Sequence, residues 1–538
     1  MGKNRKSLIG EIVFVTVASF LIVFGILYFL GTLTSGWHFV DDHEFLEYTY
    51  LMKYKNVSLG ELLRIVVEYD RTTRNNTLYY PSKVLLLMIC GADYVKLSIA
   101  KAIEVAIAMI LLYFCGKKIT GSKLISWLFA LTSLVGFQGA TWWKLGPEQM
   151  QGTVCFGIAF LCLLNWLEKP AKKGYAIVAF IFSIAMGYYH ESFFLVMPFL
   201  AFYCVYYGYK QDPELFVYTG SKSVIDYFKK LWKGLGGKAV FAVLCLCTCG
   251  VLLLAIMIRL GTSSYDPVSF SSGTPISTYI QGTIFSIEND LRWYWKFGII
   301  LVGILLTYFE QLRKKIPDML IAVIFMLPQV VLYSKEGIAE RYLLPIIIGY
   351  SLFFVAYVLQ YEFLTGKRKI FYIFVLLLML AANGRALAVE GDYYRFRGQG
   401  VTNALEQIEE MSDKGYTVMS CFGISNPEAD WTVEMYLRSK GKPDVYYWNQ
   451  ENQTVNTVRP FIKDPSSETI SLDEVDVVAC YNRDDRHFVA DPGFDLSDFT
   501  LIRSAGVDLY YRNEAAAEVT EELIQRLHVK PTFHGIGE

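Results

Sequence analysis

The sequence contains a series of apolar runs, each long enough to cross a lipid bilayer as a helix. A helix that spans the ~30 Å hydrocarbon core needs roughly 20 residues, because each residue adds about 1.5 Å. The chain is 54% hydrophobic, which is too apolar for an ordinary soluble enzyme. Its hydropathy predicts about eleven spans, at 8–33, 94–115, 124–140, 150–167, 175–189, 192–208, 238–259, 294–310, 317–333, 342–360 and 370–388.

Lysine and arginine gather in every second connection between the predicted spans. They lie at 117–123, 169–173, 222–233, 313–315 and 367–369, and Lys3, Arg5 and Lys6 precede the first span. Short cytoplasmic loops collect such residues, so the alternation predicts the orientation of the chain. The first run is too long for a cleaved signal peptide, and no small-residue cleavage site follows it. We expect a multi-pass protein of the plasma (cytoplasmic) membrane, with a cytoplasmic N-terminus and an extracytoplasmic C-terminal domain.

The composition becomes that of a soluble domain after about Glu390. Amphipathic helices are predicted at 401–411 and 428–439, strands at 416–421, 444–448 and 475–480, and a hairpin at 499–512. The predicted fold is therefore an α-helical polytopic membrane domain at 1–388 and a small extracytoplasmic α/β domain at 389–538. The tail has no glycine-rich phosphate loop, and the net charge of -1 argues against a nucleic-acid partner.

An acidic stretch, Asp41-Asp42-His43-Glu44, follows the first span. Ionisable groups at the end of a span are costly to keep there and are often functional, although a solvated acidic cap is the alternative. The predicted topology returns five polar segments to the same leaflet, so their side chains can converge on one interfacial cavity. The candidate catalytic residues are Asp41 and Asp42, and the candidate substrate-binding residues are Glu44, Arg71, Arg74, Lys144, His190, Glu191, Arg292, Glu340 and Arg341.

Carboxylates, cations and aromatic rings at the outer surface suit a substrate with a lipid tail and a phosphate head, such as a lipid-phosphate sugar. Glycosyl transfer needs a carboxylate that accepts the proton of the attacking hydroxyl. It also needs cationic donors for the departing phosphate, and the planar fork of arginine meets phosphate oxygens bidentately. Tryptophans of the outer segments either stack on sugar rings or anchor the membrane interface.

With these motifs the sequence resembles the GT-C superfamily of membrane glycosyltransferases, of the protein mannosyltransferase and aminoarabinose transferase type. The resemblance rests on the acidic motif after the first span, a long first outer loop with interfacial helices, and a soluble outer tail. It also rests on the late motif Glu340-Arg341-Tyr342-Leu343-Leu344-Pro345, which opens a span. In this family the first acidic residue is the candidate general base or metal-associated group. That residue corresponds to Asp41, with Asp42 as its companion.

The resemblance implies transfer of a sugar from a polyprenyl-phosphate donor to an extracytoplasmic glycan, lipid or protein of the cell envelope. Trp142-Trp143 is followed by Lys144, which departs from the Trp-Trp-Asp signature of the oligosaccharyltransferases and disfavours en bloc glycan transfer. No cofactor is certain, and a divalent metal (Mg²⁺ or Mn²⁺) stays open. The alternatives are a transporter or flippase of lipid-linked glycans, a polysaccharide polymerase or ligase, and a non-catalytic envelope scaffold.

For several candidate residues, a structural role remains an alternative to a functional one. Asp42 is a base, a metal ligand or a structural partner. His190-Glu191 is a substrate contact or a paired polar cap, and Glu340-Arg341 is an internal ion pair or a phosphate contact. Arg71, Arg74 and Lys144 are ligands or ordinary interfacial cations. Lys101 and Glu104, three residues apart on one helical face, are expected to neutralise each other.

Overall fold

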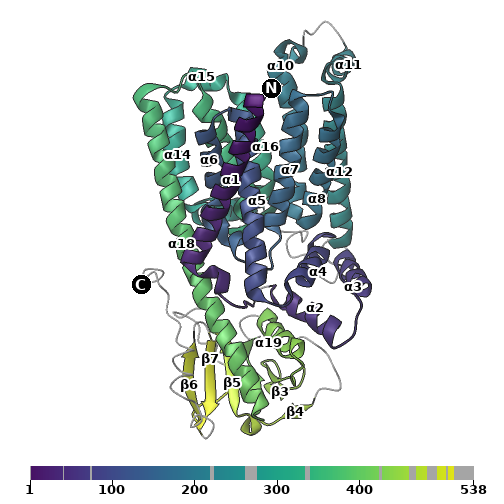
Figure 1. Ribbon diagram of the computed structural model, residues 1–538, viewed down its shortest axis with the longest axis vertical. Coiled ribbons are helices and arrows are strands. Elements are labelled where there is room, and N and C mark those ends of the chain that lie inside the picture. Colours follow the sequence, from purple (N-terminus) through teal and green to yellow (C-terminus); the bar gives the residue numbers. More distant parts are fainter. Residues whose placement is uncertain are drawn as a thin grey trace.

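The computed structural model describes residues 2–39, 41–72, 76–218, 223–260, 276–333, 340–422, 427–459, 468–481, 494–504 and 507–513. A helical bundle forms one end of the molecule and a sheet domain the other, as Figure 1 shows. Three short helices lie beside the junction between them: α2 (His43–Lys53), α3 (Leu59–Thr72) and α4 (Tyr79–Cys90). The predicted combination of a polytopic helical domain and a C-terminal α/β domain is therefore confirmed.

Within the described residues, seven helical stretches are long and apolar enough to cross a membrane, so the chain is a multi-pass membrane protein. The helices of the bundle are α1 (Gly2–Leu30), α5 (Tyr94–Thr120), α6 (Lys123–Leu134), α7 (Gln149–Glu168), α8 (Lys173–Tyr189), α9 (Glu191–Phe194), α10 (Met197–Gln211), α11 (Val224–Leu235), α12 (Gly237–Leu260), α13 (Ile276–Phe285), α14 (Arg292–Leu306), α15 (Phe309–Arg313), α16 (Ile316–Tyr333), α17 (Leu343–Ser351) and the first half of α18 (Gly366–Asp413).

Local sequence signals set several helix ends. The Asp93 carboxylate accepts hydrogen bonds from the Val95 and Lys96 N–H groups at the start of α5, and Gly121, with φ of 69°, ends that helix. The Ser58 hydroxyl accepts a hydrogen bond from the Glu61 N–H at 3.3 Å at the start of α3. The span predicted at 124–140 is shorter than expected. α6 ends at Leu134, and the chain continues as a 3₁₀ segment, η2 (Phe137–Trp142).

The tail forms a seven-stranded sheet in the order β4-β3-β2-β1-β5-β7-β6. Strand β1 pairs in parallel with β2 and β5, and the other pairs are antiparallel. The hairpin predicted at 499–512 corresponds to β6 and β7. The short strands β3 and β4 were not predicted from the sequence. The strands are β1 (Val418–Ser420), β2 (Tyr446–Asn449), β3 (Thr454–Asn456), β4 (Thr469–Ile470), β5 (Val477–Tyr481), β6 (Phe499–Ser504) and β7 (Val507–Arg512).

Helix α18 connects the bundle to the sheet domain without interruption. The span predicted at 370–388 and the helix predicted at 401–411 are parts of this one helix of 48 residues, which is about 72 Å long. Its last turns and helix α19 (Pro427–Ser439) share one hydrophobic core with a face of the sheet (Figure 1). The same core includes Trp37, Phe39 and Phe45, which follow the first span. The sheet domain is thus packed directly onto the acidic stretch that follows the first span.

Candidate active site

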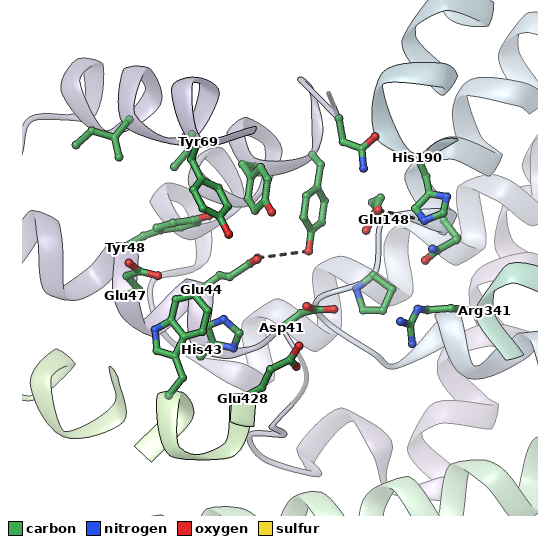
Figure 2. A pocket seen from close by; sticks show the side chains of 18 of the residues that line it. Asp41, His43, Glu44, Glu47, Tyr48, Tyr69, Glu148, His190, Arg341 and Glu428 are labelled. Carbon is green, nitrogen blue, oxygen red and sulfur yellow. Dashed lines mark hydrogen bonds and ion pairs between the residues drawn. The ribbon is translucent and has the colours of Figure 1, made fainter. Parts of the chain in front are cut away.

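A cavity of about 390 Å³ lies beside the acidic stretch, at the junction of α2, α3, α4, α19 and the ends of the bundle helices. Figure 2 shows Asp41 in its middle, with Glu44 on one side and Arg341 on the other. The lining also includes His43, Glu47, Tyr48, Leu51, Ile65, Val66, Tyr69, Asn76, Tyr79, Tyr80, Pro147, Glu148, Gln149, His190, Tyr342, Glu428 and Trp431.

Asp41 has a left-handed backbone, with φ of 64°. Such a conformation costs a non-glycine residue about 1–3 kcal/mol and persists where the surroundings impose it. Gly146 packs against the Asp41 side chain so closely that a Cβ atom there would overlap it. Among the described residues, the Asp41 carboxylate makes neither a hydrogen bond nor an ion pair, so its oxygens face the cavity without a protein partner.

Asp42 points away from the cavity and is 1% exposed. Its Oδ2 accepts a hydrogen bond from the His38 N–H at 2.9 Å, and its Oδ1 has no hydrogen-bond partner among the described residues. Burial raises the pKa of this carboxyl to about 8, although the His38 N–H and the Lys83 charge oppose the rise. This environment favours a structural role for Asp42, because its neutral carboxyl group adds no second negative charge next to Asp41.

The loop before Asp41 is held by α18. The Trp37 N–H donates to the Thr402 hydroxyl at 2.7 Å, and the His38 ring stacks on Tyr394 with ring centroids 3.5 Å apart. Gly398 lies directly against the His38 ring, where any side chain would overlap it. These contacts explain how residues distant in sequence fix the backbone that presents Asp41.

Glu44 lies on the first turn of α2 and faces a buried lysine. Lys83, on α4, ion-pairs with the Glu44 carboxylate, and the Tyr79 hydroxyl donates to the same carboxylate at 3.4 Å. Burial nevertheless raises the pKa of Glu44 to about 7, against the opposing effect of Lys83. Sequence analysis missed Lys83, although a single lysine inside the apolar segment 83–90 was the available signal.

Arg341 lies across the cavity from Glu44, on the 3₁₀ turn η6 (Glu340–Tyr342) that precedes α17. It donates to the Tyr342 hydroxyl at 3.3 Å, and no described carboxylate lies within 4.0 Å of it. Glu340 instead ion-pairs with Lys144. The internal Glu340–Arg341 ion pair, one of the two alternatives predicted for these residues, is therefore not formed. The Lys144–Glu340 pair ties the turn to the end of η2 and leaves the guanidinium of Arg341 directed at the cavity.

His190 is buried at the end of α8 and lines the cavity. Its Nδ1 accepts from the Ser192 N–H at 3.1 Å, which leaves the proton on Nε2, 3.8 Å from the Glu148 carboxylate. The paired polar cap predicted at this turn is thus formed in part, with Glu148 as the partner of His190. The Glu191 side chain lies outside the described residues.

The remaining candidates lie elsewhere. Arg292 ion-pairs with Glu390 at 3.3 Å and stands over the Phe137 ring at 3.6 Å, away from the cavity lining. The side chain of Arg71 and the whole of Arg74 lie outside the described residues. Lys101 pairs with Glu104 at 3.2 Å, as expected, and donates to the Pro147 carbonyl at 2.9 Å. The structure therefore brings together Asp41, Glu44, His190 and Arg341, whose roles stay predictions.

The cavity also contains residues that sequence analysis did not select. Glu428 and Trp431 come from α19, nearly 400 residues after Asp41, and Glu47 comes from the second turn of α2. No local motif marks these positions. Within the described part of the chain, no three His, Cys, Asp or Glu side chains are close enough to hold a metal ion. The divalent metal that the sequence analysis left open is assigned no reaction step.

The helical bundle with a C-terminal sheet domain is the fold that the resemblance predicted, and a solved structure shares it. The structure of ArnT from Cupriavidus metallidurans bound to undecaprenyl phosphate superposes with a TM-score of 0.50 at 12% identity. The match covers 94% of this chain and 99% of ArnT. The sequence matches no protein-family model and no curated protein.

Two structures of the oligosaccharyltransferase of Archaeoglobus fulgidus are also similar. The enzyme tethered to an acceptor peptide gives a TM-score of 0.42 at 12% identity, over 80% of this chain and 63% of that chain. The complex of AglB with an inhibitory peptide and dolichol phosphate gives 0.44 at 12% identity, over 96% and 77%. At these identities the likeness is one of fold.

Proposed function

We propose that this protein is a membrane glycosyltransferase that moves one sugar from a polyprenyl-phosphate donor to an acceptor on the outer side of the plasma membrane. The observation that carries the proposal is Asp41, whose carboxylate has no partner among the described residues and faces Arg341 within one cavity. The GT-C fold supports it, since ArnT, which shares this fold, was crystallised with undecaprenyl phosphate.

The reaction follows from the two groups. Asp41 accepts the proton of an acceptor hydroxyl while the hydroxyl oxygen bonds to the anomeric carbon. The bond between that carbon and the phosphate oxygen breaks, and Arg341 stabilises the charge that develops on the departing phosphate. Asp42 holds the loop before Asp41 by accepting a hydrogen bond from the His38 N–H and is a positioning residue. The Lys144–Glu340 pair positions the turn that carries Arg341.

The test compares Asp41→Asn with the parent protein in lipid nanodiscs. The substrates are a panel of synthetic polyprenyl-phosphate sugars with a cell-envelope extract as acceptor, and the readout is release of polyprenyl phosphate. We expect turnover to fall by about 10²–10⁴-fold, because the general base is removed. Binding of undecaprenyl phosphate should persist in Asp41→Asn and weaken at least tenfold in Arg341→Gln.

Asp42→Asn serves as the matched control, because it imitates the neutral carboxyl and should keep turnover within about fivefold of the parent. Undiminished turnover in Asp41→Asn would rule out the carboxylate mechanism. Transport of lipid-linked glycan that is independent of Asp41 would favour the flippase alternative. Chain extension that depends on Arg341 and not on Asp41 would favour the polymerase or ligase.

A further inference from the structure

The cavity has two chemically different ends, with Asp41 and Glu44 between them (Figure 2). One end, here called the arginine end, consists of Glu148, His190 and Arg341 from segments that adjoin the bundle helices. The other, the glutamate end, consists of Glu47, Tyr48, Tyr69, Tyr80 and Trp431 from α2, α3, α4 and α19, and Glu428 lies beside Asp41 between the two ends. A phosphate fits the arginine end, so the glutamate end is left for the second substrate.

The glutamate end contains the carboxyl group of Glu47. Glu47 makes no hydrogen bond or ion pair with any described residue, and among the residues whose side chains are described no lysine or arginine lines this end of the cavity. Arg459, whose charge acts on Glu47, ion-pairs with Glu434 and lies behind the ring of Trp431, 5.1 Å from its centroid. Burial therefore raises the pKa of Glu47 to about 7 despite Arg459.

Two buried polar groups of the cavity lining lack partners among the described residues. His43 is 3% exposed, and its Nδ1 has no hydrogen bond. Gln149 is 1% exposed, and its Oε1 has none either. Buried polar atoms without a hydrogen bond cost about 1–3 kcal/mol each unless a ligand or water satisfies them. His43 lies against Trp431 at the glutamate end, whereas Gln149 follows Glu148 of the arginine end, so each end offers one unpaired polar atom to a ligand.

Aromatic rings form the walls of the glutamate end. The Trp431 ring packs on His43 with centroids 4.1 Å apart, and Tyr69 and Tyr80 meet edge to face at 5.6 Å. Flat aromatic walls accept the apolar face of a sugar ring, and their π-faces attract a cation. The combination of aromatic rings, the Glu47 carboxyl group and the unpaired His43 Nδ1 favours a ligand that is both cyclic and positively charged.

We propose that the glutamate end binds the acceptor, and that the acceptor is a glycan carrying a protonated amine close to its attacking hydroxyl. The inference rests on the proposed function, which assigns the phosphate to the arginine end. An ammonium group has three donors and is satisfied by one carboxylate and a few neutral acceptors. Among the described residues, no three His, Cys, Asp or Glu side chains form a group that could enclose a metal ion. Together with the aromatic rings, this favours an organic cation.

The experiment measures binding to the full-length protein in nanodiscs at pH 7. The probes are two tetrasaccharides of equal length, one of glucosamine and one of N-acetylglucosamine, which differ in the charge of the amine. We expect the parent protein to bind the glucosamine tetrasaccharide at least tenfold more tightly. In Glu47→Gln the preference should fall to about twofold or less. The control Glu68→Gln, an exposed change on α3 outside the cavity, should keep the full preference.

Undecaprenyl phosphate binding by the same samples separates this inference from the proposed function. If both tetrasaccharides bind equally while undecaprenyl phosphate binds normally, the amine proposal is overturned and the glycosyltransferase proposal stands. If the amine preference is present and depends on Glu47 while undecaprenyl phosphate does not bind, the amine site is supported and the donor assignment fails. Saturable Mn²⁺ binding that Glu47→Gln abolishes would replace the organic cation by a metal and overturn the inference.

Discussion

At the level of single residues, the position of Asp41 depends on a glycine that is 105 residues away in the sequence. Gly146 has no left-handed backbone, so an alanine is compatible with its conformation, yet a Cβ atom there would overlap the Asp41 side chain. Small displacements of a reacting group lower the reaction rate by large factors. The missing side chain at Gly146 therefore leaves the space that the Asp41 side chain occupies. This arrangement can be tested without touching the carboxylate.

We expect Gly146→Ala to lower turnover about 10–100-fold while undecaprenyl phosphate binding is retained, because the base is displaced and the arginine end is untouched. The matched control is Gly174→Ala at the start of α8, where no neighbouring atom lies within 4 Å of a built Cβ. Turnover and the thermal unfolding midpoint of both variants are measured in the same nanodiscs. Equal turnover in Gly146→Ala and the parent would show that Asp41 does not need its present position.

Asp42 gives a prediction about pH. Its pKa is 3.8 in an unfolded chain and about 8 in the folded protein, so between these values the folded protein retains a proton that the unfolded chain has released. The free energy of unfolding therefore decreases as pH rises through this window, and the buried Glu44 and Glu47, with pKa values of about 7, add to the decrease.

Asp42→Asn cannot ionise and keeps an acceptor for the His38 N–H, so it should remove part of this slope. At pH 8.5 we expect it to be more stable than the parent by about 1–3 kcal/mol, and at pH 4 the advantage should be largely gone. Thermal unfolding between pH 4 and 9 measures the effect. Exposed Glu451→Gln should leave the slope as it is. Parallel curves for Asp42→Asn and the parent would place Asp42 in a polar, solvated environment instead.

At the level of elements, the apolar helices follow closely from the sequence, whereas α18 does not. Residues 389–400 are polar and contain three glycines, which predicts a loop between a span and a second helix. The structure keeps this stretch helical because its charges find partners along the helix, such as Asp392 with Arg395 at 2.9 Å. Its glycines give close packing, with Gly391 against Leu30 and Trp143. Composition alone does not distinguish a glycine that breaks a helix from one that lets a neighbour approach.

Some residues of the candidate site could likewise be predicted from the sequence, and others could not. Asp41, Glu44, His190 and Arg341 were predictable because each is an ionisable group at the end of a span, where burial is costly unless the residue has a task. Lys83, Glu428 and Trp431 were not, because their place in the cavity depends on how α4 and α19 pack against α2. Which face of a soluble helix meets a loop nearly 400 residues earlier is decided by tertiary packing that hydropathy does not contain.

At the level of the whole molecule, the arrangement of charge implies an orientation in the membrane. In Figure 1 the N-terminus and α15, next to the basic residues at 313–315, lie at the end of the bundle opposite the sheet domain. Basic loops mark the cytoplasmic side. The cavity, the glutamate end and the sheet domain would then all face outward, so a soluble acceptor reaches Asp41 without crossing the bilayer.

The sequon Asn452-Gln453-Thr454 tests this orientation directly. Asn452 is exposed in the turn between β2 and β3, far along the chain from the last span. If the protein is inserted into eukaryotic microsomes in the expected orientation, Asn452 faces the lumen and should be glycosylated. The measurement is a mobility shift that endoglycosidase reverses and that Asn452→Gln abolishes. A protein that inserts fully, shows no such shift and loses its sheet domain to protease added outside the microsomes would have the opposite topology, which places the cavity on the cytoplasmic side and excludes an extracytoplasmic acceptor.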